Sequence, residues 1–346
     1  MTASGAFRVA AAQLRGLFFR PADDVERIVR TVRRARDRGI SLVVFPETFV
    51  GGYPYWRGHV SVRRSAELAA RLHEAAIAVD GPEVAEIAAA CVECGVGAVV
   101  GANERDDRRG SETTFNTLLF FHPERGYAGR HRKLIPTHTE RAYWGRGGRE
   151  DLRVVDYPFA VVGGLICYEH HMLLSRMALA LMGEQVHCAA WPGYWETGEH
   201  LADKRPGPAA RHGEIDAVVR DYALSTQTFV VSANALVDPG QAPADLREML
   251  GYNLGRGGSA VVDPSGRYLA GPVLDEEGLV EAEIDLGARR LAKAYLDTVG
   301  HYARWDVFRF GLKDPVEGPD LEWADPARGE ARSVAEPRSA CAGPEP

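Results

Sequence analysis

Short runs of β-branched and apolar residues alternate with helical patterns along most of this 346-residue chain. The alternation restricts the fold more than any other feature, because strands interleaved with amphipathic helices form layered α/β architectures. Nine such runs favour two sheets over one. The strands are predicted at Arg8–Gln13, Leu42–Pro46, Gly97–Ala102, Thr117–Phe121, Ala160–Cys167, Val186–Trp191, Phe229–Ala233, Ala260–Asp263 and Leu279–Ile284.

The segment between the first two predicted strands has the pattern of an amphipathic helix. Val25, Ile28, Val29 and Val32 recur at helical spacing, and Gly39 stands where a C-terminal cap is expected. We expect this helix to cover one face of a sheet. Further helices are predicted at Pro82–Cys94, Leu173–Gly183, Glu214–Ala223 and Leu286–Tyr295, and a late β meander at Ala260–Ile284.

The composition changes after residue 313. Residues 314–346 contain eight acidic residues, three arginines and six prolines, and they carry five of the seven net negative charges of the chain. This composition predicts a loosely ordered segment. We therefore expect a single domain over residues 1–313 and an acidic, proline-rich tail over 314–346. The tail is either a solvated terminus or a contact between subunits, with Leu321 and Trp323 as its anchors.

Charge and hydropathy patterns exclude several classes of partner. The longest uncharged stretch, Tyr222–Val237, has 16 residues and contains Ser, Thr, Gln and Asn, so it is too short and too polar to span a bilayer. The first residues lack the basic and then apolar organisation of a secretory signal, which predicts a cytoplasmic protein. A net charge of −7 argues against nucleic acid. We expect neither a membrane nor a nucleic-acid partner.

The five cysteines do not form a disulfide framework, because they are odd in number and scattered. Their distribution predicts a reducing compartment. Cys91 and Cys94 have the spacing of half a zinc site, but no second pair follows and their setting is helical. Cys188 lies in an apolar strand and is predicted to be core. We expect no metal site.

Cys167 differs from the other cysteines in its setting. It closes the apolar run Ala160–Cys167, and a helical pattern begins a few residues later. A strand-to-helix turn exposes a side chain above the sheet edge and directs backbone N–H groups towards it. A thiol with a pKa of about 8.5 needs a nearby base or cation to act as a nucleophile. The alternative is a small buried hydrophobic residue.

Three charged residues can supply such partners. Glu47 follows the strongly apolar strand Leu42–Pro46, a position suited to a general base. Lys133 ends the basic run 130–133, and Glu140 lies seven residues beyond it. Each of them alone is more often a surface charge than a catalytic group.

Together these segments are more specific. Pro46-Glu47, Arg132-Lys133-Leu134 and Cys167-Tyr168-Glu169, in this order, resemble the Glu-Lys-Cys triad of the nitrilase superfamily of carbon–nitrogen hydrolases. The resemblance covers roughly residues 5 to 310. Segments typical of the nitrilase branch are FPETFVGGYP (45–54), HRKLIPTHTER (131–141), GEQVHCAAWPG (183–193), GGSAVVDPSGRYLAGP (257–272) and DTVGHYARWDVF (297–308).

The resemblance implies a fold and a catalytic set. The fold is a four-layer α-β-β-α sandwich, and the catalytic residues are Glu47, Lys133, Cys167 and Glu140. In this scheme Glu47 takes the thiol proton, and the thiolate attacks a nitrile carbon to give a thioimidate, then a thioester and finally the carboxylic acid and ammonia. Lys133 stabilises the developing negative charge, and Glu140 holds Lys133 and the substrate in register.

The resemblance also implies which residues and partners surround the reaction. Tyr53, Tyr168, Trp191 and Pro192 are expected to bind the substrate, an organic nitrile that is small and aliphatic or arylaliphatic. Water is the second substrate, and no cofactor is needed. Members of this branch often form dimers that extend into spirals or rings. We therefore expect a homo-oligomer, either a dimer or a higher spiral assembly.

The chain departs from the family pattern next to the nucleophile. Many members read Cys-Trp-Glu-Asn followed by Met-Pro-Leu, whereas residues 167–174 read CYEHHMLL. Tyr168 is a smaller ring with a hydroxyl, and a Cys-aromatic-Glu-His form also resembles the cyanide-degrading branch. His170 and His171 are predicted to be turn or interface residues, because the superfamily chemistry requires no histidine.

Several alternatives to nitrile hydrolysis to the acid remain open at this point. They are cyanide hydrolysis, aliphatic amide hydrolysis and nitrile hydration that stops at the amide. The WPG segment and the GHYARWDVF ending favour a nitrile over an amide. A non-catalytic, filament-forming scaffold on the same fold is a different class of protein. Retention of all four implied catalytic residues argues against it.

Overall fold

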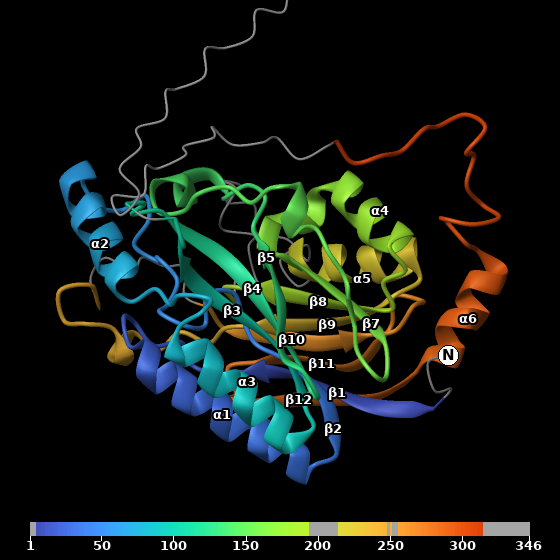
Figure 1. The fold of residues 1–346 in the computed structure, drawn as a ribbon, viewed down its shortest axis with the longest axis horizontal. Coiled ribbons are helices and arrows are strands. Elements are labelled where there is room, and N and C mark those ends of the chain that lie inside the picture. Colours follow the sequence, from blue (N-terminus) through green and yellow to red (C-terminus); the bar gives the residue numbers. More distant parts are fainter. Residues whose placement is uncertain (1–4, 109, 194–213, 248–249, 251–254, 314–346) are drawn as a thin grey trace, which may run out of the picture. The chain divides into compact units, whose positions relative to one another are not determined.

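The structure is a computed structural model that describes residues 5–108, 110–193, 214–247, 250 and 255–313 (Figure 1). Its first sheet has six strands in the order β12-β1-β2-β3-β4-β5. Strands β1, β2 and β3 are parallel to one another, and the remaining pairs are antiparallel. The bounds are β1 (Ala6–Gln13), β2 (Ile40–Val44), β3 (Gly97–Arg105), β4 (Thr114–His122), β5 (Gly126–Arg132) and β12 (Gly278–Asp285).

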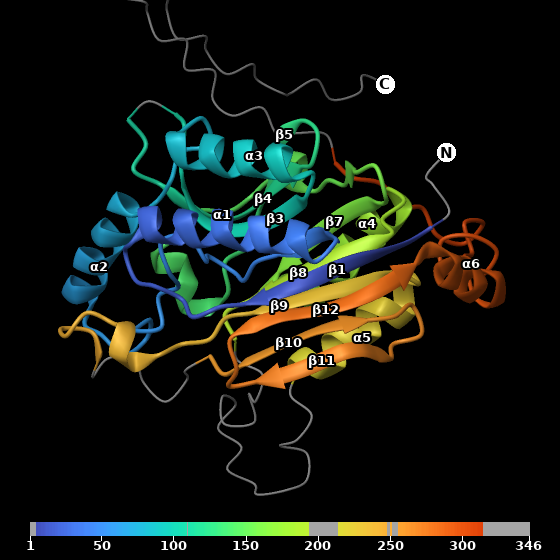
Figure 2. The ribbon, with the colours of Figure 1, turned by 90° about the horizontal axis from the view of Figure 1, so that it is seen from below.

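The second sheet also has six strands, in the order β11-β10-β9-β8-β7-β6. Strands β7, β8 and β9 are parallel, and both edges are antiparallel. The two sheets pack face to face, as Figure 2 shows, with β1 against β9 and β10 and β2 against β8. The bounds are β6 (Val155–Asp156), β7 (Val161–Ile166), β8 (Val186–Trp191), β9 (Phe229–Asn234), β10 (Gly257–Val262) and β11 (Tyr268–Leu274).

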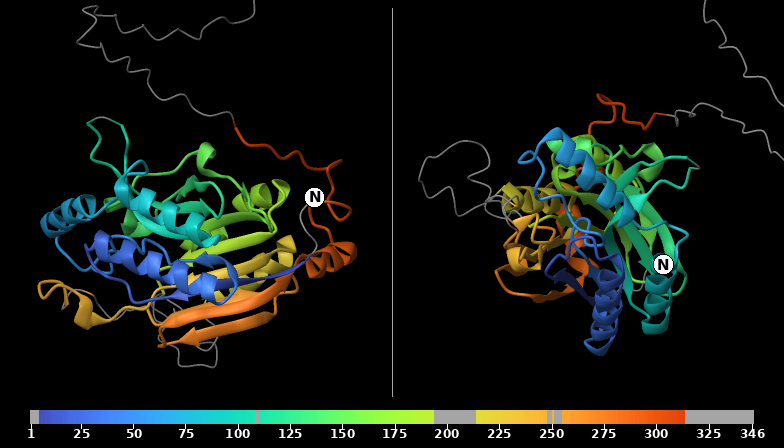
Figure 3. Two further views of the ribbon diagram at one scale, coloured as in Figure 1. Left: turned by 60° about the horizontal axis from the view of Figure 1, so that its bottom comes forward. Right: turned by 90° about the vertical axis from the view of Figure 1, so that its left-hand side faces the viewer.

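Helices cover the outer faces of both sheets. Helices α1 (Pro21–Asp37) and α3 (Pro82–Cys94) pack on the first sheet, and α4 (Leu173–Leu181) and α5 (Glu214–Thr226) lie over the second. Figure 3 shows the sheets between these two helical layers. Helices α2 (Val62–Glu74) and α6 (Leu286–Tyr295) lie outside the four layers. The predicted four-layer α-β-β-α sandwich is confirmed.

The inner strands β2, β3 and β4 of the first sheet are buried on both faces, which explains the nearly continuous apolar sequence of β2. In β2, Leu42 and Val44 point into the core between the sheets. Val43, together with Phe45 just beyond the strand, belongs to the core under α1 and α3. Side chains alternate because the period of a strand is two residues. One strand thus joins two cores.

Two strands and one helix were not predicted from the sequence. Strand β5 is polar and at an edge, and β6 has two residues, so neither shows a clear apolar run. Strand β11 lies within the predicted meander but was given no bounds of its own, because Gly271 and Pro272 interrupt its apolar sequence. Helix α2 is rich in arginine and begins after Ser61, whose hydroxyl accepts a hydrogen bond from the amide of Arg64. The predicted β meander is wrong in its last strand. Strand β12 leaves β10 and β11 and pairs with β1 in the other sheet.

The described residues contain no helix that is both long and apolar enough to cross a bilayer. The described chain up to residue 312 belongs to one compact unit. The predicted tail at 314–346 lies outside the described residues, so its role stays a prediction.

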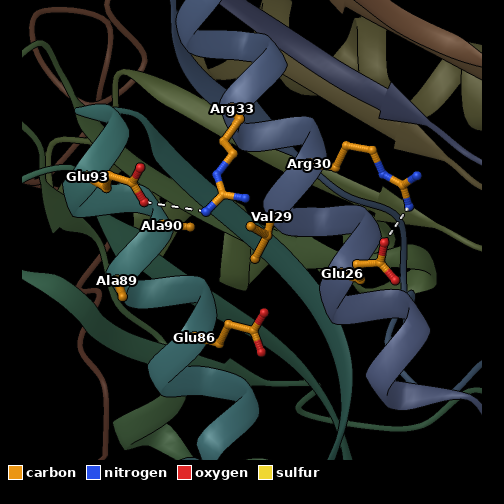
Figure 4. A pocket seen from close by; sticks show the side chains of 8 residues that line it. All are labelled: Glu26, Val29, Arg30, Arg33, Glu86, Ala89, Ala90 and Glu93. Atoms are coloured by element: carbon orange, nitrogen blue, oxygen red, sulfur yellow. Dashed lines mark ion pairs between the residues drawn. The ribbon is translucent and has the colours of Figure 1, made fainter.

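A groove of about 410 Å³ runs between α1 and α3 on the outer surface (Figure 4). Its charges pair with each other: Arg30 lies 3.5 Å from Glu26, and Arg33 lies 3.5 Å from Glu93. None of the predicted site residues lines it. Because acids and bases in the groove largely compensate one another, it does not select a ligand of one charge.

Candidate active site

The four predicted catalytic residues meet inside the molecule. Glu47 follows β2, Lys133 directly follows β5, and Cys167 directly follows β7, while Glu140 lies in the 3₁₀ turn at residues 138–142. All four side chains are buried. One sulfur or oxygen atom from each of Glu47, Glu140 and Cys167 lies within 4.8 Å of the others. The fold therefore assembles this group from segments up to 120 residues apart in the sequence.

Lys133 joins the two carboxylates. Its Nζ donates hydrogen bonds of 2.8 Å to Oε1 of Glu47 and of 2.8 Å to Oε2 of Glu140. Burial opposes the charge on Lys133, but Glu140 and Glu47 outweigh it and raise the pKa of the ammonium. A buried charge is stable only when it is paired and hydrogen-bonded. The ammonium therefore fixes both carboxylates in place.

One carboxylate oxygen of Glu47 accepts hydrogen bonds, and the other is open, without a described hydrogen-bond partner. Oε1 accepts hydrogen bonds from Lys133 and from Nδ2 of Asn116 at 2.6 Å, whereas Oε2 has no hydrogen-bond partner among the described residues. Burial raises the pKa of Glu47 to about 7, against the effect of Lys133 and with a contribution from Glu140. A base with a pKa near the working pH is best suited to accept and return a proton.

A glycine in the neighbouring strand places Glu47. A Cβ on Gly101 of β3 would lie 2.1 Å from the carbonyl oxygen of Pro46 and 2.9 Å from the Cα of Glu47. The backbone before and after Glu47 therefore lies directly on β3, which only glycine permits. This close approach sets the height of Glu47 above the end of the sheet.

Cys167 occupies a strained turn. Its φ of 53° lies in the left-handed region, which costs a residue with a Cβ about 1–2 kcal/mol. Burial, together with Glu47, raises the pKa of the Cys167 thiol well above its ordinary value. The resting thiol is therefore protonated, and a base must remove its proton for the sulfur to act as a nucleophile. Glu47 is the adjacent carboxylate with an open oxygen.

Glu169 links the turn of Cys167 to the Lys133 segment. Its Oε2 accepts a hydrogen bond of 2.8 Å from the amide of Ile166, and its Oε1 accepts one of 2.6 Å from the amide of Leu134. Nε2 of His131 lies 2.9 Å from the same carboxylate, and Nδ1 of His131 lies 2.9 Å from the Asp151 carbonyl. Both partners of His131 are acceptors. Although burial opposes it, Glu169 raises the pKa of His131.

The chain matches known proteins over most of its length. Residues 8–294 match the family model for carbon-nitrogen hydrolases. The aliphatic nitrilase of Rhodococcus rhodochrous is 38% identical over 315 residues, which cover 87% of this chain and 81% of the relative. This chain belongs to the nitrilases of the carbon–nitrogen hydrolase family. The predicted family is confirmed, and with it the class of hydrolases that act on carbon–nitrogen bonds.

Two further proteins extend the nitrilase comparison. The arylacetonitrilase of Trametes versicolor is 35% identical over 310 residues, which cover 85% of this chain and 92% of the relative. Among solved structures, Nit3 of Saccharomyces cerevisiae, a member of branch 10 of the nitrilase superfamily, has a TM-score of 0.66 at 18% identity. That match covers 87% of this chain and 98% of the yeast protein. It supports the same fold.

Of the four predicted substrate-binding residues in this nitrilase, Tyr53 bonds directly to a catalytic-set side chain. Its hydroxyl donates a 2.5 Å hydrogen bond to Oε1 of Glu140. Although burial opposes it, the positive charges of Lys133 and Arg57, together with this bond, hold the pKa of Glu140 below its ordinary value. Glu140 therefore stays ionised while Glu47 titrates. The pKa values of the two carboxyl groups differ in direction, and Glu140 accepts hydrogen bonds from more donors than Glu47 does.

The other three predicted substrate-binding residues have protein partners. The Tyr168 hydroxyl donates to Oε2 of Glu214 at 2.9 Å. Trp191 is buried, and its ring stacks on His170 with centroids 4.6 Å apart. The Pro192 carbonyl accepts a 2.7 Å hydrogen bond from Tyr55. Their roles towards a substrate stay predictions.

The remaining described cysteines are buried and unpaired: Cys91 and Cys94 on α3, which confirms their predicted helical setting, and Cys188 on β8, which confirms its predicted place in the core. Burial raises the pKa of Cys91 to about 12. Within the described ranges, the only clustered group that could hold a metal is Glu47, Glu140 and Cys167. Lys133 already supplies the positive charge between these carboxylates, so the group does not fit a metal ion.

Sequence reasoning missed two residues of the site. Asn116 was not singled out, because an amide in an apolar strand carries no catalytic signal of its own. Glu169 was quoted within the Cys167 segment without a role. Its position two residues after Cys167 was the available signal, but its partners His131 and Leu134 come from another segment and cannot be identified from the local sequence.

Replacement of Asn116 tests how the pKa of Glu47 is set. Asn116→Leu removes a donor to the Glu47 carboxylate, so the pKa of Glu47 rises. Because a base acts only when deprotonated, we expect the acidic limb of kcat/KM to move to higher pH by about one unit, the size of one lost charge-assisted hydrogen bond. The measurement is kcat/KM against pH.

The neighbouring residue provides the control for this variant. The Thr117 hydroxyl donates to a different carboxylate, Oε2 of Glu104, at 2.7 Å. Thr117→Val should leave the acidic limb where it is. An unshifted limb in Asn116→Leu would contradict this account of Glu47.

Proposed function

We propose that this protein is a nitrile aminohydrolase that converts an organic nitrile, small and aliphatic or arylaliphatic, into the carboxylic acid and ammonia. The observation that supports it most is the buried ammonium of Lys133 between Glu47 and Glu140, with Cys167 alongside. The relatives named as an aliphatic nitrilase and an arylacetonitrilase support the nitrile as substrate.

In the first step, Glu47 takes the proton of Cys167 as its sulfur bonds to the nitrile carbon. One π bond of the nitrile breaks, and its electron pair moves to nitrogen, which receives the proton to give a thioimidate. Lys133 has three protons, of which two are donated to Glu47 and Glu140. The third stabilises the negative charge on nitrogen in the transition state.

Two molecules of water complete the reaction. Glu47 takes a proton from the first water as its oxygen bonds to the thioimidate carbon, and the nitrogen is protonated and leaves as ammonia. A thioester to Cys167 remains. The second water attacks in the same way, the carbon–sulfur bond breaks, and the thiol regains its proton. Glu47 acts as base and then acid in each step, which suits a pKa of about 7.

The test is ammonia release across a panel of nitriles, amides and cyanide, with product identification. We expect ammonia and acid from nitriles, with little from amides or cyanide. Cys167→Ala should abolish turnover and the covalent adduct seen by intact mass. The control Cys188→Ala, at a cysteine that is buried in β8, should retain both. No ammonia or amide from any member of the panel, or full activity in Cys167→Ala, would contradict the proposal.

We further propose that the protein acts in the reducing cytoplasm, which its free, buried cysteines support. We also propose a homo-oligomer whose subunits meet through α4 and α5. Leu173 and Leu174 on α4 are 69% and 72% exposed, and Leu224 on the adjacent α5 is 52% exposed. A contiguous exposed apolar surface marks a contact, and we propose that these leucines form one.

A charge on this surface tests the oligomer. Leu174→Glu should lower the particle mass measured by light scattering, because a carboxylate is costly in an apolar interface. Val62 on α2 is 90% exposed and lies at the first helical position, so Val62→Glu serves as the control and should leave the mass unchanged. An unchanged mass in Leu174→Glu would exclude this surface as the contact.

A further inference from the structure

We propose that His170 is a positioning residue for the nucleophile, held in one orientation by a chain of hydrogen bonds through His187 and Glu184 behind Cys167. The catalytic scheme described above uses none of these three residues. The kinetic effects expected below rest on the proposed function, whereas the positioning role itself rests on the hydrogen-bond geometry.

The first link joins His170 to the backbone of the nucleophile. Nδ1 of His170 lies 2.7 Å from the carbonyl oxygen of Cys167. On the other side of Cys167, the amide of Ile166 donates to Glu169. The carbonyl of Cys167 and the amide of the residue before it are therefore both bonded to side chains from the same turn. Strained backbone persists only when its surroundings fix it in this way.

The direction of the chain follows from its first acceptor. A carbonyl can only accept, so Nδ1 of His170 carries the proton and Nε2 of the neutral ring is an acceptor. Nε2 of His187 lies 2.9 Å away and must donate to it. Nδ1 of His187 then accepts from Oε1 of Glu184 at 2.8 Å, while the hydroxyl of Tyr222 donates to Oε2 of Glu184 at 2.6 Å. Glu184 is therefore protonated.

Burial supports each of these protonation states. Burial holds the pKa of His170 and the pKa of His187 well below the ordinary value of a histidine. The nearby positive charge of Arg176 lowers both pKa values further. Burial raises the pKa of Glu184 to about 8. Both rings are thus neutral and the Glu184 carboxyl is protonated near neutral pH, as the hydrogen-bond directions require.

Neighbouring residues also restrain His170. The ring of Trp191 stacks on it at 4.6 Å, and Nε of Arg176 donates to the His170 carbonyl. The ring of His187 in turn stacks on Tyr222 of α5 with centroids 3.8 Å apart. Glu169 ties the same turn to the first sheet, whereas His170 ties it to β8 and α5 of the second. The nucleophile is thereby fixed to both halves of the sandwich.

Two replacements of His170 separate positioning from packing. The amide nitrogen of Asn occupies the place of Nδ1, whereas that of Gln reaches the place of Nε2. His170→Asn can still donate to the Cys167 carbonyl, so we expect its kcat to stay within about threefold of the wild type. His170→Gln cannot, and we expect kcat to fall about 100-fold with KM changed less than about threefold, the cost of a misplaced reacting group.

A replacement of Glu184 tests the proton order. The side chain of Gln donates from nitrogen and accepts at oxygen, as a protonated Glu does. Glu184→Gln should therefore keep kcat within about threefold and leave the thermal unfolding midpoint nearly unchanged. If Glu184 were ionised beside a charged His187, the same variant would leave a buried cation unpaired and lower that midpoint markedly.

The rate of Cys167 alkylation by iodoacetamide, followed by intact mass, needs no nitrile turnover. We expect His170→Asn to be alkylated at the wild-type rate and His170→Gln at least tenfold more slowly. Equal alkylation and equal kcat in the two folded variants would overturn the positioning role. If His170→Gln does not fold, marked loss of stability in Glu184→Gln would overturn it instead. A wild type that is alkylated but releases no ammonia would contradict only the proposed function.

Discussion

The structure depends on one buried ammonium. Lys133 is surrounded by protein, and the two hydrogen bonds to Glu47 and Glu140 compensate its charge. A single cation cannot neutralise two carboxylates completely, so one of them must have a raised proton affinity. Tyr53 and the amide of Thr137 both donate to Glu140, whereas burial, with a contribution from the charge of Glu140, raises the pKa of Glu47. The base of the proposed reaction is produced by this imbalance.

The fold brings Glu47, Lys133, Glu140 and Cys167 together in a buried site. Strands β2, β5 and β7 end at the site, and each contributes a functional residue immediately or shortly after its end. Cys167, the proposed nucleophile, has an unfavourable backbone conformation, and hydrogen bonds to Glu169 and His170 hold the backbone on either side of it. Burial raises the pKa of both Cys167 and Glu47, with opposite consequences for the proton transfer between them. It makes the thiol of Cys167 a weak acid, and it gives Glu47 the affinity to take the proton.

Short-range patterns in the sequence were sufficient to predict the layers, and the resemblance to the nitrilase superfamily supplied the candidate catalytic set. Apolar runs such as Leu42–Pro46 revealed strands because both faces are buried, and the order of Glu47, Lys133 and Cys167 indicated the family. Contacts that depend on how distant strands align could not be predicted from the sequence. Asn116 meets Glu47 across 69 residues, and β12 pairs with β1 rather than with its sequence neighbours. His170 was predicted in a turn, but its burial against His187 depends on how β7 and β8 align.

The most direct test of the coupled Glu47–Cys167 pair is the rate of Cys167 alkylation by iodoacetamide as a function of pH, in the wild type and in Glu47→Gln. In the wild type, the rate should rise with a midpoint near pH 7, where Glu47 loses its proton and begins to act as base. In Glu47→Gln this midpoint should be absent, and the rate should rise only at the much higher pH at which the buried thiol itself ionises. A midpoint near pH 7 in both proteins would contradict the account.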